Sequence, residues 1–467
     1  MSLEDNLYPF LKLYLGTPTW AKNFVGFIYN LIPNSIKYGK FYKEYYKRIK
    51  KFQHLDKLQT LIETEKLLIL NVNEAIKKVE FYKKYKKIES IKEFTSLPVV
   101  TKDIINEDKE LFINKSKRSY FLKANTGGSS GEPFTFYIHK GTTRSKEKAH
   151  FDWYWSKYGY KPRKRMLMLR GKALKNNVDF EYGAIGNKLI INCNNINENS
   201  IENIYDAIRK FKPDFIHAYP SALTIFTNAC KAYLKKSSFE LNLKAIFLGS
   251  EGVSVSDINY FENFYASKIV NWYGHSESLI HGVRYNLEED FIFYPFYGYI
   301  ELLDENDKVI IQPNKIGRIV ATGFDNEVMP LIRYDTGDLG QISGNKKLIN
   351  HNFVIKNIEG RDKNYIFLKD GTTITLTSLI FGEHYKAFEY IKELQVIQSN
   401  MGVILIKIVP LNIMTIRQIK DFEDSLLKSV KPNTLELRIV LVKETKKTSR
   451  GKHILLIQNF QNTFKTL

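Results

Sequence analysis

A stretch rich in glycine and hydroxyl residues, Thr-Gly-Gly-Ser-Ser-Gly-Glu-Pro at positions 126–133, has the composition of a loop that wraps a phosphate. Glycine reaches positive φ without steric cost, so consecutive backbone N–H groups can turn inwards on one anion, and the hydroxyls add donors. The candidate phosphate ligands are Thr126, Gly127, Gly128, Ser129, Ser130 and Gly131. A flexible turn has the same composition. Glu132 after Gly131 excludes the Lys-Ser/Thr ending of a nucleoside-triphosphatase P-loop.

The composition is that of a globular protein with two or three domains. The chain has 467 residues, of which 43% are hydrophobic and 26% charged. Two cysteines, Cys193 and Cys230, show neither metal-ligand spacing nor a disulfide framework, so a reducing, cytoplasmic setting is expected. The acidic and aromatic start is unlike a signal peptide, and the apolar stretch 20–32 is too short to span a bilayer.

The chain is strongly basic, with 70 lysines and arginines against 50 acidic residues and a net charge of +20. A basic surface can meet nucleic acid or anionic lipid, or attract a polyanion such as ATP or coenzyme A. It can also be solvated without any partner, which is the interpretation we favour. No RNP-type motif, helix-turn-helix pattern or zinc-finger spacing is present, so no specific nucleic-acid partner is expected.

Residues 1–60 are basic and aromatic, and a helical extension is predicted there. Within 40–53, apolar residues recur at helical spacing and define one stripe. They are Phe41, Tyr45, Ile49 and Phe52. A basic amphipathic helix can lie on an anionic membrane. We favour docking of this stripe on the body of the protein, because the aromatic side chains would otherwise stay exposed.

Alternating strands and helices predict an α/β fold with mostly parallel sheets. Strands are expected at 165–170, 215–217, 245–248 and 268–272, and helices at 145–158, 201–210, 220–234 and 256–265. Short strands and turns between 297 and 342 predict a β-rich subdomain, and the last hundred residues have a small α/β pattern of their own. The expected domains are 1–60, 61–362 and 363–467.

Six short motifs in a fixed order resemble those of the adenylate-forming ligase superfamily. They are TGGSSGEP at 126–133, GSE at 249–251, YGHSE at 273–277, RYDTGD at 333–338, EGRD at 359–362 and SRGK at 449–452. Further segments are similar to the branch of phenylacetate–CoA ligases, coenzyme F390 synthetases and CapK-type capsular polysaccharide proteins. These segments are LPVVTK at 97–102, AYPS at 218–221 and MPLIRY at 329–334.

The resemblance implies a site for ATP and Mg²⁺. The loop at 126–131 would hold the β- and γ-phosphates, although Phe134 stands where the superfamily often has a lysine. The other implied nucleotide ligands are Gly249, Ser250, Glu251 and Tyr273 around the adenine, Gly274 elsewhere in the ATP site, Ser276 at the α-phosphate, Glu277 at Mg²⁺, Asp338 at the ribose hydroxyls, and Arg361 at the ribose or phosphates. Taken alone, Tyr273 could be a core aromatic, Glu277 a solvated charge and Asp338 part of an Asx-type turn.

The resemblance also assigns the catalytic residues of adenylation, Lys452 and Glu277. A positioned ammonium stabilises the negative charge that develops as pyrophosphate leaves. Outside this context, Lys452 would simply face solvent. Lys363, two positions after Arg361, falls where the superfamily has a hinge, so the C-terminal domain is expected to be mobile. The residues expected to line the acid's pocket, or else to be ordinary core, are Trp153 and Trp155, the turn from His217 through Tyr219 and Pro220 to Ser221, and His275.

The function that the resemblance implies is activation of a carboxylic acid by ATP to an acyl-adenylate, followed by acyl transfer. The acceptor would be coenzyme A, or an amine or hydroxyl in surface-polysaccharide biosynthesis. Adenylyl transfer to an acceptor is an alternative. A catalytically silent basic scaffold is the rival from another class, and it would need none of Glu277, Asp338, Arg361 and Lys452.

Overall fold

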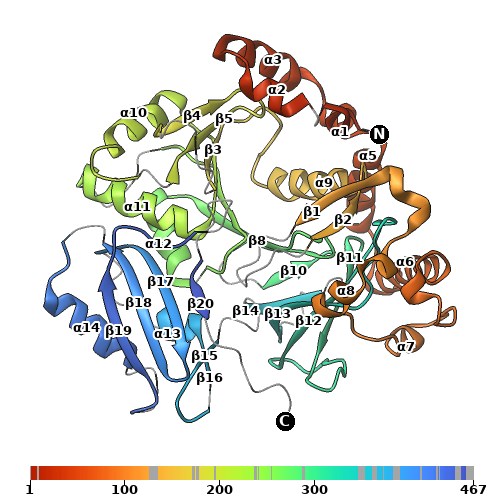
Figure 1. Ribbon diagram of the computed structural model, residues 1–467. Helices are drawn as coiled ribbons and strands as arrows, with labels where there is room; N and C mark the ends of the chain where they lie inside the picture. The colour runs from red at the N-terminus through yellow and green to blue at the C-terminus, as the bar shows by residue number, and fades with distance from the viewer. Residues whose placement is uncertain are drawn as a thin grey trace.

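The structure, a computed structural model, describes most of the chain between Ser2 and Gln458. The described residues are 2–7, 10–125, 135–170, 174, 178–193, 196–235, 239, 241–253, 255–286, 290–344, 353–359, 365–371, 373–381, 390–410, 413–427, 430, 432–447 and 454–458. Figure 1 shows the chain from its N-terminal helices to its C-terminal strands, which occupy opposite ends of the molecule.

A twelve-stranded sheet forms the centre of the described molecule. Its spatial order is β11-β12-β13-β14-β10-β9-β8-β7-β6-β3-β5-β4. Five neighbouring strands, β8, β7, β6, β3 and β5, are mutually parallel, and β4 is antiparallel at the edge. These strands are β3 (Met166–Leu169), β4 (Phe180–Gly183), β5 (Lys188–Ile191), β6 (Phe215–Ala218), β7 (Ala245–Gly249) and β8 (Lys268–Gly274). The predicted parallel α/β core is therefore confirmed.

Helices cover both faces of the parallel strands, because successive strand residues point to opposite faces. Ile216 and Ile246 pack in one core with α10 (Ile201–Phe211), α11 (Pro220–Leu234) and α12 (Val255–Tyr265). Phe215 and Phe247 pack in another core with α9 (Thr143–Ser156). Strands buried on both faces need near-continuous apolar sequence, and β6 and β7 are buried at every position.

The β-rich part continues the same sheet with antiparallel strands. These are β9 (His281–Arg284), β10 (Phe291–Phe293), β11 (Gly298–Leu303), β12 (Ile316–Gly323), β13 (Tyr334–Ile342) and β14 (Phe353–Glu359). The switch of direction occurs between β8 and β9, where Trp272 lies opposite Val283. A hairpin of β1 (Phe121–Asn125) and β2 (Thr135–His139) flanks the glycine-rich stretch, with Asn125 paired to Thr135.

Helical segments before β1 cover the antiparallel strands and share a core with them. They are α6 (Lys57–Lys78), η2 (Glu80–Tyr82), α7 (Ile91–Phe94), α8 (Lys102–Glu107) and η3 (Lys109–Phe112), and η4 (Lys115–Tyr120) follows them without burying a side chain. The side chain of Thr101 accepts a hydrogen bond from the backbone N–H of Ile104 and so caps the N-terminus of α8.

The C-terminal part has a separate apolar core, which begins at Ile366. It contains the two-stranded sheet β15 (Tyr365–Phe367) and β16 (Thr373–Thr375), and a four-stranded sheet of β17 (Ile391–Asn400), β18 (Val403–Pro410), β19 (Glu436–Leu441) and β20 (Leu456–Gln458). Its helices are α13 (Leu376–Phe381) and α14 (Ile416–Leu427).

In the described part of the chain, five short α-helices precede α6: α1 (Leu3–Leu7), α2 (Leu11–Gly16), α3 (Thr19–Leu31), α4 (Asn34–Lys37) and α5 (Gly39–Phe52). As predicted, α5 docks on the body of the protein, where the hydroxyl of Tyr42 donates to Asp152 of α9 at 2.8 Å. The predicted stripe was wrong at Phe41, which is exposed. Tyr42 is buried in its place, one residue later and on the same side as Tyr45 and Ile49. Among the described residues, no helix has the length and hydropathy needed to cross a membrane.

Candidate functional site

Polar residues follow the carboxyl ends of four neighbouring parallel strands. Arg170 follows β3, Tyr219 follows β6, Ser250 follows β7, and His275 follows β8. The register pairs Leu169 with Ala218, and Gly249 with Trp272, so these strands end at one edge of the sheet. Ligands of open parallel sheets bind at such an edge. The candidate site therefore combines motif residues, namely Tyr219, Ser250 and His275, with Arg170, which belongs to no motif.

Gly249 is required at the end of β7 because the indole of Trp272 lies against it. A Cβ at position 249 would come within 2.2 Å of that ring. Trp272 is buried, and its ring stacks on the imidazole of His281 with the ring centroids 5.6 Å apart. Gly249 therefore lets two strands pack closely beside Ser250 and Glu251.

We expect Gly249→Ala to lower the free energy of unfolding by about 1–3 kcal/mol, the usual cost of overpacking. The added methyl group would overlap the buried ring of Trp272. Urea denaturation measures this loss. Gly252→Ala is the matched control, because a Cβ there meets nothing within 4 Å. Equal effects of the two substitutions would contradict the close packing of Gly249 on Trp272.

Arg170 joins the ends of three strands. Its guanidinium donates to Nε2 of His217 at 2.9 Å and to Oγ of Ser250 at 3.0 Å, and it lies 4.7 Å from the ring centroid of Tyr219. Burial, reinforced by the charge of Arg170, holds the pKa of His217 well below its usual value. His217 is therefore neutral and accepts the hydrogen bond at Nε2. Sequence reasoning missed Arg170, although a cation directly after a buried strand was a signal for it.

Asp338 and Tyr273 meet across the sheet. The Tyr273 hydroxyl donates to Oδ2 of Asp338 at 2.6 Å. Burial and then the Asp338 charge raise the pKa of Tyr273 well above its usual value, so the hydroxyl keeps its proton. Tyr273 is therefore more than a core aromatic, because its hydroxyl donates a hydrogen bond to Asp338 of the RYDTGD motif.

The tight turn in RYDTGD uses other side chains than Asp338. Oδ1 of Asp335 accepts from the backbone N–H of Gly337 at 2.8 Å, and Oγ1 of Thr336 accepts from the N–H of Asp338 at 3.2 Å. The Asx-type turn expected as the alternative role of Asp338 is therefore made by Asp335. The carboxylate of Asp338 instead accepts the hydrogen bond from Tyr273.

Glu277 is buried, which rules out the interpretation as a solvated charge. The hydroxyl of Tyr334 donates to its Oε1 at 3.2 Å, and Nδ1 of His275 lies 3.6 Å from its Oε2. Ser276, which lies between His275 and Glu277 in the sequence, is exposed. No cluster of three or more His, Cys, Asp or Glu side chains suited to a metal occurs among the described residues. A Mg²⁺ ion bound through one carboxylate and nucleotide phosphates needs no such cluster.

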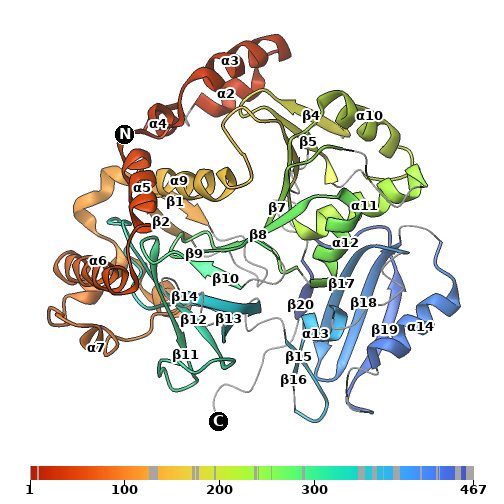
Figure 2. The ribbon, with the colours of Figure 1, turned by 180° about the vertical axis from the view of Figure 1, so that it is seen from behind.

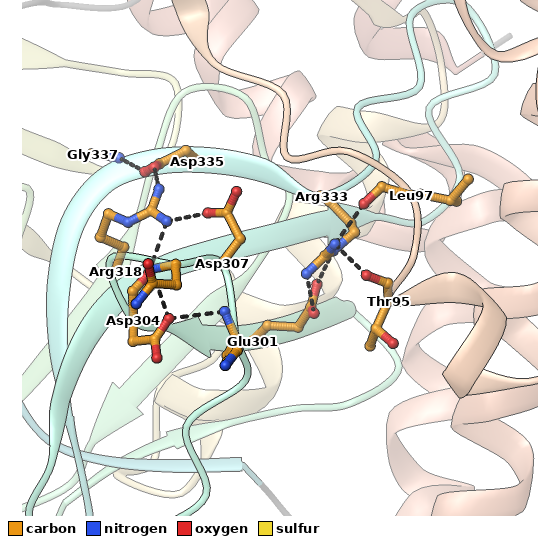
Figure 3. Close-up of polar contacts among 11 residues, drawn as sticks. Thr95, Leu97, Glu301, Asp304, Asp307, Arg318, Arg333, Asp335 and Gly337 are labelled. Atoms are coloured by element: carbon orange, nitrogen blue, oxygen red, sulfur yellow. Dashed lines mark hydrogen bonds and ion pairs between the residues drawn. The ribbon is translucent and has the colours of Figure 1, made fainter. Parts of the chain in front are cut away.

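Arg333 ties two motifs that are more than 200 residues apart in sequence. Its guanidinium forms two hydrogen bonds of 3.1 Å with the carboxylate of Glu301, and it also donates to the carbonyl oxygens of Thr95 and Leu97 (Figure 3). Both ionic side chains are buried. The backbones are also paired, because the N–H of Val100 donates to the carbonyl of Arg333 at 2.9 Å. Segments 97–102 and 329–334 therefore form one structural unit.

That unit positions β13. Arg318 of β12 pairs with Asp335 and with Asp307, as Figure 3 shows. The N–H of Asp335 donates to the carbonyl of Val100 at 2.9 Å. One contact holds the side chain of Asp335 and the other its backbone, three residues before Asp338, so both position the segment that carries the Asp338 carboxylate.

The expected pocket residues are only partly brought together. Tyr219 contacts Arg170, and Pro220 is buried at the first turn of α11 beside Ser221. Trp153 instead faces α5, with its ring 5.8 Å from that of Tyr46. Its neighbour Trp155 is the tryptophan that faces the site, at 5.1 Å from the ring of His217.

Several predicted site residues lie outside the described residues. They are Thr126, Gly127, Gly128, Ser129, Ser130, Gly131, Arg361, Lys363 and Lys452. The described neighbours of the Lys452 segment are anchored by one buried amide. Nε2 of Gln395 donates to the carbonyls of Lys446 at 2.9 Å and Ile454 at 2.7 Å, and its Oε1 accepts from the N–H of Lys446.

No protein-family model and no curated protein sequence matches the chain. Among solved structures, it is similar to 2-hydroxyisobutyryl-CoA ligase in the postadenylation state in complex with 2-HIB-AMP, with a TM-score of 0.63 and 16% identity over 85% of this chain and 90% of that chain. The same ligase scores 0.53 in the thioesterification state with 2-HIB-AMP and CoA, over the same shares and at the same identity. Its open conformation scores 0.51, at 16% identity over 84% of this chain and 90% of that chain.

At this sequence identity the likeness shows the fold. The chain has the fold of adenylate-forming ligases, with one large mixed sheet and a separate smaller sheet. The predicted fold class is confirmed.

Proposed function

We propose that this chain activates a carboxylic acid with ATP and then transfers the acyl group to an acceptor. In the first step an oxygen of the acid bonds to the α-phosphorus of ATP, the bond to the bridging oxygen breaks, and pyrophosphate leaves. In the second step the acceptor bonds to the acyl carbon and AMP leaves. The observation that carries the proposal is the meeting of Tyr273 with Asp338, and of Glu277 with Tyr334, at one edge of a ligase-type sheet.

The nucleoside of ATP would bind beside the hydrogen-bonded pair Tyr273 and Asp338. An ionised carboxylate only accepts hydrogen bonds and suits the two ribose hydroxyls. The 2.6 Å bond from Tyr273 orients Asp338 before the ligand arrives. The backbone of Gly249, Ser250 and Glu251, together with the Tyr273 ring, would frame the adenine, which offers a flat face for stacking.

We expect Asp338→Ala to weaken ATP binding by about tenfold to 100-fold, because hydrogen bonds to a charged group contribute about 1.5–3 kcal/mol. Isothermal titration calorimetry measures the dissociation constant. Tyr273→Phe keeps the ring and removes only the hydroxyl, so it should weaken binding less. Unchanged ATP affinity in a folded Asp338→Ala variant would contradict the ribose role.

The phosphates would lie towards the exposed side of the site. Ser276 is exposed there and would donate to the α-phosphate, with Gly274 and the loop at 126–131 supplying backbone N–H donors. Glu277 would hold Mg²⁺, which when bound would neutralise phosphate charge. Phe134 in place of a lysine leaves this phosphate site dependent on N–H donors and the metal.

A domain rotation would bring Lys452 to the α-phosphate for the first step and remove it for the second. Lys363 would be the hinge, with Arg361 beside it. The strands on either side of residues 360–364 belong to different sheets and different cores, which supports a hinge there.

The acyl group of the acid would contact the residues around Arg170. The lining would be Arg170, His217, Tyr219 and Trp155, with Pro220, Ser221 and His275 at the margin. A guanidinium and a neutral imidazole beside aromatic rings suit an acid that carries a hydrogen-bond acceptor as well as apolar surface. We place Trp153 outside this pocket, since it packs on Tyr46.

For the acceptor we favour the thiol of coenzyme A, because CoA is named with the structurally similar ligase. An amine or hydroxyl in surface-polysaccharide building is the alternative that the CapK resemblance supports. A screen of pyrophosphate release over aryl, fatty and amino acids, with and without CoA, tests both steps. CoA-stimulated release with one class of acid supports the thiol, and release that CoA leaves unchanged favours another acceptor.

A further inference from the structure

Helix α3 turns its apolar face to solvent. Trp20, Phe24 and Phe27 are 74%, 63% and 63% exposed. The exposed large side chains of this helix recur at the spacing of a single helical stripe, and they are Trp20, Phe24, Phe27, Ile28 and Leu31, with Val25 beside them. A surface helix of a globular protein normally buries such a stripe against the core. In α3 this stripe is exposed to solvent instead.

The opposite, polar face of α3 is the one that docks. Gly26 lies so close to the β4–β5 turn that a Cβ would come within 2.4 Å of the Cβ of Ala184. Asn30 donates to the carbonyl of Ala184 at 2.7 Å and accepts from the N–H of Gly186 at 2.8 Å. Nε of Arg163 donates to the carbonyl of Asn30 at 2.8 Å. These contacts fix the helix with its aromatic side chains pointing outwards.

Further exposed apolar side chains occur on the neighbouring N-terminal helices. Eleven of the 28 exposed large hydrophobic side chains of the described chain lie between Leu7 and Phe41. Besides those of α3 they are Leu7, Phe10, Leu13, Ile36 and Phe41. Figures 1 and 2 show α2 and α3 at the rim of the molecule, beyond β4 and β5 and far from the C-terminal strands. An apolar patch of this kind on a folded protein marks an interaction surface.

Basic residues accompany the patch. Between positions 10 and 52 the chain has nine lysines and arginines and one acidic residue, Glu44. Lys40, Lys43 and Lys47 are exposed on α5, and they line a pocket of about 480 Å³ together with the exposed Ile36. The exposed Ile36 therefore lies among cationic side chains.

We propose that α2 and α3, with the lysines of α5, form a contact surface for an anionic lipid bilayer. Aromatic and aliphatic side chains on one face of a short helix, with lysines beside them, are the composition of a helix that lies in the headgroup region. The 13-residue α3 would lie along the bilayer, since it is too short to cross it. A second copy of this chain is a poorer occupant, because a two-fold contact would bring the same lysines together.

The test is co-sedimentation of the full chain with two kinds of vesicle: equal parts phosphatidylglycerol and phosphatidylcholine, and phosphatidylcholine alone. We expect binding to the anionic vesicles that falls as salt rises from about 0.1 M to about 1 M, because the Debye length shrinks from about 10 Å to about 3 Å. A variant carrying Trp20→Ser, Phe24→Ser and Phe27→Ser should bind about tenfold or more weakly, since the apolar area that enters the interface is lost.

The matched control replaces Leu58, Leu61 and Ile62 on α6 by serine, because these side chains are also exposed but lie outside the patch. This control should bind as the wild type does. A variant with Lys40, Lys43 and Lys47 changed to glutamine should lose the preference for anionic vesicles. Equal loss in the α6 control, or no vesicle binding by the wild type, would overturn the proposal. Self-association that the α3 variant abolishes, without vesicle binding, would assign the patch to a second copy and also overturn it.

Discussion

Lys452→Ala is expected to lower acid-dependent exchange of pyrophosphate into ATP by about 10²–10³-fold, the usual effect of removing one preorganised donor from a developing negative charge. Acyl transfer from a supplied acyl-adenylate should stay close to the wild-type rate, because the proposed domain rotation removes this lysine before the second step. Exchange and single-turnover acyl transfer, measured side by side, separate the two half-reactions.

Lys443→Ala is the control for this prediction. Lys443 is an exposed lysine in the same C-terminal segment, just after β19, and its removal should change neither half-reaction. Equal loss of both steps in Lys452→Ala would contradict a role confined to adenylation. The anchoring of Lys446 and Ile454 by Gln395 gives the segment a fixed base from which such a lysine can be presented.

Arg333→Met is expected to lower the free energy of unfolding by about 3–5 kcal/mol, because it leaves the carboxylate of Glu301 buried without its ionic partner. The carbonyls of Thr95 and Leu97 lose donors as well. Urea denaturation measures the loss. A double variant, Arg333→Met with Glu301→Leu, should recover most of the stability, since the uncompensated charge is gone.

The loss should depend on pH. Burial already raises the pKa of Glu301, and the charge of Arg333 opposes that rise. Without Arg333 the folded variant would hold a proton at pH values where the unfolded carboxyl is ionised. The folded state then binds more protons, so its stability falls as pH rises through this range. The deficit should be smallest below the ordinary glutamate pKa of 4.5 and grow as the pH rises above it. A deficit that does not change with pH would contradict the ionic role of the pair.

Much of the fold could be predicted because the periodic patterns are local. Helix α11 has the predicted bounds 220–234, and the four predicted parallel strands are present within one or two residues. Local patterns could not predict that the parallel strands and the antiparallel strands of the β-rich part form one sheet. That continuity depends on the pairing of β8 with β9, which sequence periodicity does not encode. The outward orientation of α3 depends on its contact with Ala184, 158 residues further along the chain.

The site was predictable where motif residues make the contacts, and less so elsewhere. Tyr273, Glu277 and Asp338 lie at the expected edge of the sheet, and all three hydrogen-bond to a residue of another motif. Arg170 and Trp272 belong to no motif, yet they link the strand ends. The two tryptophans of α9 differ by two residues, which places them on different sides of the helix, and only the structure shows that Trp155 faces His217.

The most direct test of the central claim is exchange of labelled pyrophosphate into ATP by the wild-type chain, with a panel of carboxylic acids and no acceptor. Such exchange requires a reversible acyl-adenylate. We predict exchange that depends on one class of acid and on Mg²⁺, and that needs no coenzyme A. Exchange that proceeds equally without any acid, or no exchange with any acid although ATP is bound, would contradict acid activation by this protein.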